Sequence, residues 1–306
     1  MTASPSGKTN LHNGVVVLDK PAGITSHDCV NKLRRIFLTK RVGHCGTLDP
    51  IATGVLLVCV GNATRIAEYL TSKPKRYVAI AEFGKTSTTQ DRTGEIITDC
   101  GAESISASTV EDVMRGFTGH IKQLPPMVSA LHHNGQRLYD LARKGVEVER
   151  ELRDITIYAL QLLDFTPGRN PIATLDITCS TGTYIRTLIH DIGEKLGVGG
   201  IMNELRRTAV GDVDISKAIT LPELNDLSES KELSNAVIPI TDALPDWPRV
   251  ILDQDQVSDI LHGRQIVVPD TTDCETAFLL DEANDLVALA KVNSCTIQPF
   301  KVFLQV

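Results

Sequence analysis

The sequence has no long apolar run and few aromatic residues. None of its hydrophobic stretches approaches the roughly 20 residues that a membrane-spanning helix needs, and aromatic residues make up only 4% of the 306. The first ten residues, MTASPSGKTN, lack the apolar centre of a signal peptide. We therefore expect a cytoplasmic protein without a membrane anchor, with a disordered tail over residues 1–12.

Motifs of several common enzyme chemistries are also missing. The seven cysteines are odd in number and widely spaced, and no Cys-x-x-Cys pair indicates a zinc or redox site. The chain contains no P-loop, no Gly-x-Gly-x-x-Gly after a strand, no His-Glu-x-x-His and no nucleophile elbow. Nucleotide hydrolysis, dinucleotide redox chemistry and zinc hydrolysis thus have no support, and we predict neither a metal nor a cofactor.

Charge is distributed unevenly, although a net charge of −7 at first argues against a nucleic-acid partner. Residues 221–306 hold 15 acidic and 5 basic residues, a net of −10, so residues 1–220 carry +3. The segment 31–41 has five bases and no acid, and 73–76 has three bases in four residues. Such runs are typical of a solvated surface, but they are also what phosphate binding requires.

Hydrophobic patterning predicts an α+β protein in which extended segments dominate. Ser26 is expected to cap the first helix, and Gly197 to end the one with the clearest apolar stripe. The predicted elements include strands within 14–23, 76–84, 155–165 and 173–180, and helices over 26–37 and 181–197. We expect them to form a large mixed or antiparallel central sheet flanked by helices.

Two further segments differ from the rest in pattern. Residues 123–153 begin with a Pro-Pro break and offer little core of their own, so they form either an excursion that closes over a ligand or an ordinary surface connection. Beyond about residue 245 the chain changes to short β segments with one helical piece around 257–262. A small β-barrel-like domain over 246–306 fits this pattern and leaves 13–245 as the main domain.

One carboxylate, that of Asp49, lies in the glycine-rich stretch RVGHCGTLDPIATGVLLVCVGNATR, residues 41–65. Thr-Leu-Asp-Pro is also a common way to begin a turn, and this simpler interpretation stands beside a catalytic one. Glycines permit close backbone approach to a ligand, and a carboxylate held there can act as a nucleophile or a base. The neighbours His44 and Cys45 offer a cysteine nucleophile as an alternative, but the sequence identifies no partner that would lower the thiol pKa.

The same stretch resembles the signature of the TruB-type pseudouridine synthases, and the likeness covers nearly all of residues 14–220. The matching segments, in the family's order, are GVVVLDKPAGITSHD (14–28), GHCGTLDPIATGVLLVCVGNATR (43–65), KRYVAIAEFG (75–84), QLPPMVSALHHNGQRLYDLARKG (123–145), CSTGTYIRTLIHDIGEKLG (179–197) and LRRTAVG (205–211). The resemblance implies the pseudouridine synthase fold for 13–245 and a PUA-like β-barrel for 246–306. It also implies conversion of the uridine at position 55, in the T arm of tRNA, into pseudouridine.

The resemblance assigns catalytic roles to three residues. Asp49 attacks the anomeric carbon of the ribose or removes a proton from the adjacent carbon, after the base has been flipped out of the RNA stack. Tyr77 lies against the base and serves in removing the C5 proton, while Arg186 pairs with Asp49 and keeps it ionised. Simpler interpretations are a strand residue for Tyr77 and a surface charge for Arg186. The positions matched around the flipped nucleotide are His44, Asp91 and Leu205, the last of which would otherwise be plain core.

The resemblance also implies how tRNA is held. Residues 123–153 match a thumb that folds over the T loop, with Lys20 near the active site and Tyr184 stacking on or bonding to RNA. The thumb's phosphate-binding cations are Arg137, Arg143 and Lys144. We expect a monomer that needs no protein partner. The alternatives are a guide-RNA-dependent rRNA pseudouridine synthase, whose long basic tails this chain lacks, and a non-catalytic RNA-binding or tRNA-folding protein, which would not need Asp49.

Overall fold

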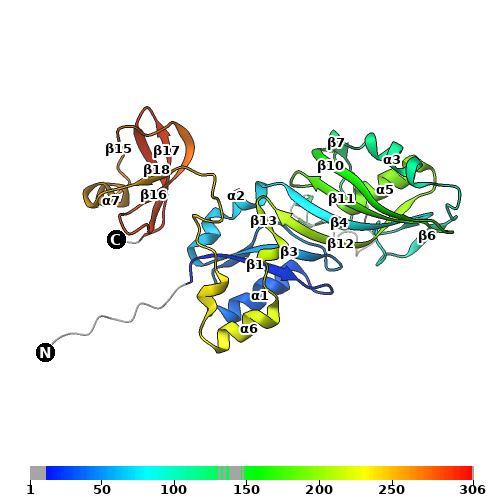
Figure 1. Ribbon diagram of the computed structural model, residues 1–306, viewed down its shortest axis with the longest axis horizontal. Coiled ribbons are helices and arrows are strands. Elements are labelled where there is room, and N and C mark those ends of the chain that lie inside the picture. Colours follow the sequence, from blue (N-terminus) through cyan, green and yellow to red (C-terminus); the bar gives the residue numbers. More distant parts are fainter. Residues whose placement is uncertain (1–11, 130–131, 134–135, 138–145, 147, 305–306) are drawn as a thin grey trace.

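A nine-stranded mixed sheet forms the centre of the computed structural model, which describes residues 12–129, 132–133, 136–137, 146 and 148–304 (Figure 1). Across this sheet lie β1 (Gly14–Lys20), β3 (Thr53–Val60), β12 (Gly200–Val210), β4 (Lys75–Phe83), β11 (Ile172–Cys179), β10 (Arg153–Thr166) and β7 (Gly119–Gln123), with β2 (Val42–His44) beside β3 and β13 (Val213–Asp214) beside β12. The β12–β3 pair is parallel, whereas the other pairs within this sheet are antiparallel. The predicted α+β class with a mixed central sheet is confirmed.

The helices of the described residues include those predicted over 26–37 and 181–197 and around 257–262, together with three others. They are α1 (Ser26–Ile36), α2 (Ala67–Ser72), α3 (Ala107–Arg115), α5 (Ile185–Leu196), α6 (Leu221–Glu229) and α7 (Gln254–Leu261), with 3₁₀ turns η1 (Gly61–Ile66), η2 (Ile215–Lys217) and η3 (Leu233–Ala236). The predicted cap of α1 is wrong by one residue. Thr25 is the cap: its hydroxyl accepts from the Asp28 N–H at 3.0 Å, and the Asp28 carboxylate accepts from the Thr25 N–H at 2.9 Å. Helix α5 ends as expected at Gly197 but begins at Ile185 rather than 181.

Both faces of the central sheet are buried near β1 and β3. Successive strand residues point to opposite faces, and on β1 Val16 and Leu18 belong to one core while Val15 and Val17 belong to another. The first core is shared with α1, α3, α5 and α6. The second is shared with η1, α2 and the C-terminal segment. Burial on both faces explains why the sequence of β1 is a continuous apolar run and does not alternate between apolar and polar residues.

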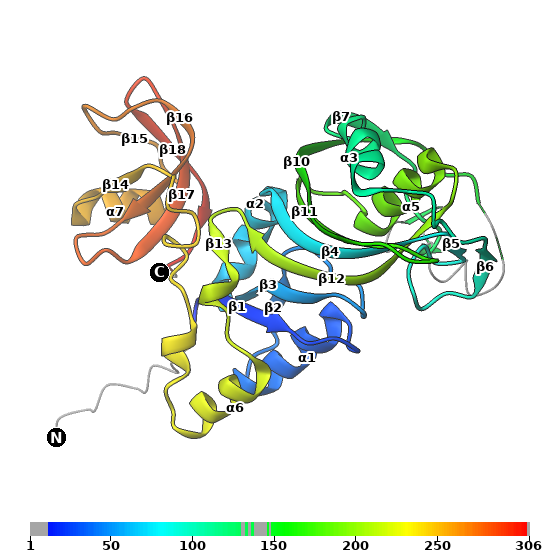
Figure 2. The ribbon, with the colours of Figure 1, turned by 45° about the vertical axis from the view of Figure 1, so that its right-hand side comes forward.

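The C-terminal segment forms its own five-stranded curled sheet, as predicted (Figure 2). Its strands, in sheet order, are β14 (Arg249–Ile251), β16 (Cys274–Leu280), β17 (Leu286–Asn293), β18 (Thr296–Val302) and β15 (Ile266–Val267), and α7 packs on them. This sheet stands beside α2, at the opposite end of the molecule from α3 and α5. The ring of Trp247 lies 4.8 Å from that of Tyr69 and 5.2 Å from that of Phe278, so it joins the two parts.

Two short hairpins extend from the central sheet. One pairs β5 (Lys85–Ser87) with β6 (Ile96–Asp99). The other, β8 (His132–His133) with β9 (Gln136–Arg137), lies in the 123–153 excursion that leaves the sheet after β7 and returns at β10. Within the described part of the chain, no helix is long and apolar enough to cross a membrane.

Candidate active site

Asp49 lies in the turn between β2 and β3. The Ala52 N–H donates to the Asp49 carbonyl over 3.0 Å, so the Asp-Pro pair does begin a turn. Ser26, the first residue of α1, holds the backbone next to it: its hydroxyl accepts from the Leu48 N–H at 2.8 Å and donates to the Leu48 carbonyl at 3.1 Å. The turn interpretation and the catalytic one are therefore compatible, because the turn itself presents the carboxylate.

Glycine is required where this loop re-enters the sheet. Gly54 has a φ of +98°, and a Cβ atom there would lie 2.2 Å from the carbonyl oxygen of Arg207 on β12. Gly46, at the start of the loop, has a φ of +97°, and a Cβ atom there would lie 3.6 Å from the Arg207 Nη1. Left-handed backbone at both positions brings the loop close to β12, which a residue with a side chain could not do without strain.

Lys20, at the end of β1, supports the loop from inside the protein. Its side chain is completely buried, and its Nζ donates to the carbonyls of Ala52 at 2.8 Å, Pro21 at 2.8 Å and Pro50 at 3.3 Å. Burial lowers the pKa of Lys20, while Cys29 and Asp49 raise it. With three protein carbonyls as acceptors, Lys20 holds the backbone on either side of Asp49 and presents no exposed surface.

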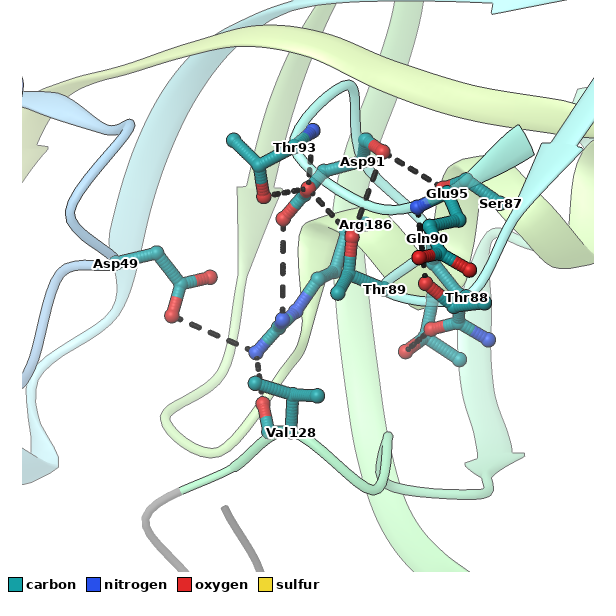
Figure 3. A network of polar contacts seen from close by, with 11 residues as sticks. Asp49, Ser87, Thr88, Thr89, Gln90, Asp91, Thr93, Glu95, Val128 and Arg186 are labelled. Carbon is teal, nitrogen blue, oxygen red and sulfur yellow. Dashed lines mark hydrogen bonds and ion pairs between the residues drawn. The ribbon is translucent and has the colours of Figure 1, made fainter. Parts of the chain in front are cut away.

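Arg186, in the first turn of α5, joins two carboxylates (Figure 3). Its Nη2 lies 3.4 Å from the Oδ1 of Asp49 and donates to the Val128 carbonyl at 2.5 Å, while its Nη1 lies 3.9 Å from the Oδ2 of Asp91. Only 4% of the Arg186 side chain is exposed, against 33% for Asp49. Arg186 is thus no surface charge, and about a third of the Asp49 side chain remains open to solvent.

Asp91 is held in one orientation by the β5–β6 loop. Its Oδ1 accepts hydrogen bonds from the Thr89 hydroxyl at 2.7 Å and from the Thr93 N–H and hydroxyl at 2.9 and 2.5 Å. Ser87 donates to the Asp91 carbonyl at 2.6 Å. Because Oδ1 already has three donors, Oδ2 is the oxygen that remains for Arg186. Asp91 is buried and faces this arginine, and it acts on Asp49 both by its own negative charge and through its pairing with Arg186.

The electrostatic balance at Asp49 has opposing parts. Burial raises the pKa of the Asp49 carboxyl, and the negative charge of Asp91 raises it further. The Arg186 guanidinium is the main influence that lowers this pKa, and Lys20 adds a smaller one. Arg186 therefore supplies most of what keeps the carboxylate ionised in a site that otherwise favours its protonated form.

Tyr77 and Leu205 lie on neighbouring central strands, β4 and β12. Both are buried and belong to the same hydrophobic cluster as Leu48, which precedes Asp49. Arg207 is the direct ladder partner of Tyr77. Burial raises the pKa of the Tyr77 hydroxyl, and the positive charge of Arg207 opposes that rise. The structure thus brings Tyr77, Leu205 and the Asp49 loop together.

His44 and Cys45 lie at the end of β2 in different surroundings. His44 is half-buried, its Nδ1 has no hydrogen-bond partner among the described residues, and its pKa is lowered by burial and then by Arg207. Its imidazole is therefore neutral at pH 7. Cys45 is completely buried, with its Sγ 3.4 Å from that of Cys59, so it cannot reach a substrate. The cysteine-nucleophile alternative is wrong.

Tyr184 precedes α5 and is fixed by a residue that the sequence did not single out. The side chain of Gln123, at the end of β7, accepts from the Tyr184 N–H at 2.8 Å and donates to the Tyr184 carbonyl at 3.0 Å. The guanidinium carbon of Arg186 lies 5.9 Å from the centre of the Tyr184 ring. Gln123 thus fixes the backbone of Tyr184, which directly precedes α5 and lies two residues before Arg186.

The predicted thumb cations are placed only in part. Arg137 lies in β9, whereas Arg143 and Lys144 are outside the described residues. In the part of the chain that is described, no three His, Cys, Asp or Glu side chains are grouped so that they could hold a metal ion.

Together, the fold and the family match identify a pseudouridine synthase. A solved structure of an H/ACA RNP bound to a substrate RNA containing 2′-deoxyuridine has a chain that is 28% identical, with a TM-score of 0.72 over 96% of this chain and 86% of that one. A chain of the archaeal box H/ACA sRNP Nop10–Cbf5 complex is 26% identical, with a TM-score of 0.70 over 96% and 87%.

Within this class, the chain belongs to the TruB family. The family model described as TruB family pseudouridylate synthase (N terminal domain) matches residues 34–185, and that of the tRNA pseudouridylate synthase B C-terminal domain matches 186–245. Two relatives named tRNA pseudouridine synthase B are those of Symbiobacterium thermophilum, 47% identical over 82% of each chain, and of Dehalococcoides mccartyi, 38% identical over 96% of this chain and 97% of that one.

Proposed function

We propose that this protein isomerises the uridine at position 55, in the T arm of tRNA, to pseudouridine, as a monomer that needs no partner protein. The observation that carries the proposal is the partly exposed Asp49 carboxylate paired with the buried Arg186. Membership of the TruB family and the names of relatives at 38–47% identity support tRNA as the substrate.

The chemistry needs one ionised carboxylate and no energy source. The N-glycosidic bond of the uridine is exchanged for a bond from C5 of uracil to the anomeric carbon. Asp49 begins this exchange by attacking the anomeric carbon or by removing a proton from the adjacent carbon. Both routes start from the anion, so the effect of Arg186 on the pKa of Asp49 serves either one.

The target nucleotide has to leave the RNA stack to reach Asp49, at a cost of roughly a few kcal/mol. His44 lies five residues before Asp49 and, being neutral and half-buried, suits a position beside the vacated stack. Leu205 and Tyr77 offer apolar contact to the uracil ring. Tyr77 is also the group proposed to take the C5 proton.

Most of the tRNA affinity is assigned to residues 13–245, with 123–153 as the thumb. The last part of the chain, proposed as a PUA-like domain over 246–306, has few cations available for phosphate. Its four basic residues are each paired with a carboxylate, as Arg249–Asp242, Arg264–Asp259, Lys291–Glu275 and Lys301–Glu68. Paired cations release fewer counterions on binding, so this part contributes little affinity.

The proposal is tested with the purified protein and an unmodified tRNA transcript that carries tritium at C5 of uridine. We expect tritium release from a single position, mapped to 55, with no other protein or RNA added. A guide-RNA-dependent enzyme would be silent in this mixture. A non-catalytic RNA-folding protein would bind the transcript without releasing tritium. Either result would contradict the proposed function.

A further inference from the structure

Arg207 is a buried cation that touches both ends of the Asp49 loop. It lies on β12 with 1% of its surface exposed. Its Nε donates to the Val55 carbonyl at 2.6 Å, and its Nη2 donates to the Gly46 carbonyl at 3.1 Å. Among the described residues, no carboxylate lies within ion-pair distance of it. Burial of a charged group without a counter-charge lowers the stability of the fold. The buried Arg207 guanidinium therefore carries a considerable desolvation cost.

The guanidinium also faces Tyr77. The two residues are direct partners in the antiparallel β12–β4 ladder, which puts their side chains on one face of the sheet. The positive charge of Arg207 lowers the pKa of the Tyr77 hydroxyl. Cys179 on β11 and Asp49 act in the opposite direction, as does burial. Arg207 is thus the one group of these that favours the phenolate.

The adjacent Arg206 has a different environment. Its Nη2 lies 2.8 Å from the Oδ2 of Asp19, its Nη1 donates to the Asp19 Oδ1 at 3.2 Å and to the Thr53 hydroxyl at 3.3 Å, and 43% of its side chain is exposed. Successive residues of a strand point to opposite faces. Only Arg207 therefore reaches the side of the sheet on which Tyr77 lies.

We propose that Arg207 is a positioning residue that fixes the Asp49 loop against Tyr77 and stabilises the Tyr77 phenolate while it accepts the C5 proton. The inference rests on the proposed function, in which Tyr77 serves in that proton transfer. In this role, the buried Arg207 side chain holds the Asp49 loop and the Tyr77 hydroxyl in fixed positions relative to each other.

The proton balance of the isomerisation fits this role. C5 of uracil loses one proton and N1 gains one, so the reaction needs no external acid or base. Tyr77 carries the exchange if its phenolic proton passes to N1 of the detached base and the C5 proton then replaces it on Oη. Between these transfers Tyr77 is an anion in a buried site, where an adjacent guanidinium has its largest effect.

The test compares tRNA transcripts with protium and with deuterium at C5 of uridine, in single-turnover reactions with excess enzyme. For Arg207→Met we expect pseudouridine formation to slow by about 100-fold and the isotope effect to exceed that of the parent. Arg207→Lys should restore part of the rate and reduce the isotope effect. Arg206→Met is the matched control and should behave as the parent. Thermal unfolding and tRNA binding check that each variant is folded.

Coupling to Tyr77 separates this role from mere support of the loop. If Arg207 acts through the tyrosine as well as on the loop, Arg207→Met should cost less in a Tyr77→Phe background than in the parent. Equal losses in both backgrounds with no added isotope effect would overturn the proposal. Should Arg207→Met fail to fold, Arg207→Lys carries the same test with a smaller expected isotope effect. A parent protein that forms no pseudouridine would instead contradict the proposed function, and that result is visible before any variant is made.

Discussion

Replacement of Arg186 by alanine should slow pseudouridine formation by three orders of magnitude. The Arg186 Nη2 lies 3.4 Å from the Asp49 Oδ1. At an effective dielectric constant of about 20, two unit charges at this separation interact by roughly 5 kcal/mol. Because 33% of the Asp49 side chain is exposed, solvent screening reduces the loss to about 4 kcal/mol, which corresponds to about a thousandfold in rate.

The assay is single-turnover conversion of a tRNA transcript across a range of pH, with thermal unfolding as the check on folding. Arg186 lowers the pKa of Asp49, so its removal raises that pKa. Because the reaction needs the carboxylate, the rate of Arg186→Ala should still rise with pH where the parent's rate is already level. Arg186→Lys retains the charge and should lose less. A folded Arg186→Ala variant with a near-parent rate would refute the reasoning.

Three further predictions concern the surroundings of the site. Asp91→Asn should slow single-turnover conversion by about tenfold, because the buried guanidinium beside Asp49 loses one of its two charge partners. It should also move the acid limb of the pH–rate profile to lower pH, since Asp91 raises the pKa of Asp49. An unchanged profile would contradict this. Gly54→Ala should lower the free energy of unfolding by roughly 3 kcal/mol or more, while Gly168→Ala, which meets open space, should cost little; denaturant unfolding measures both. Arg264→Ala should leave the Kd for tRNA within about threefold of the parent in filter binding, because this cation is already paired. A loss of tenfold or more would show that the C-terminal sheet binds RNA.

Much of the fold follows from local pattern. The helix over 26–37 and the Gly197 terminus are predictable because caps and apolar spacing are local properties of the chain. The missed cap has a local cause as well. Thr25 and Ser26 are both good capping residues, and the choice falls on Thr25 because Asp28 completes its capping box while the Ser26 hydroxyl binds the backbone of Leu48.

The site could be predicted only in part. Asp49 stands out because glycines and a Pro surround it, and Arg186 and Tyr77 follow from the family resemblance. The burial of Arg186 could not be predicted, because burial depends on tertiary packing. On an amphipathic helix, the sequence alone predicts that an arginine lies on the exposed face. Arg207 is buried, whereas its neighbour Arg206 is partly exposed. Because the two residues are identical, the sequence does not show which of them faces the protein interior.

The most direct test of the central claim compares the parent with Asp49→Asn in the tritium-release assay. Asparagine keeps the shape of the side chain and removes the anion from which both routes start. Asp154→Asn is the matched control, because its carboxylate is 85% exposed and pairs with Lys122 at the surface. We predict that Asp49→Asn binds tRNA as tightly as the parent and releases no tritium, while the control is unaffected. Tritium release by Asp49→Asn at a rate comparable to the parent's would contradict it.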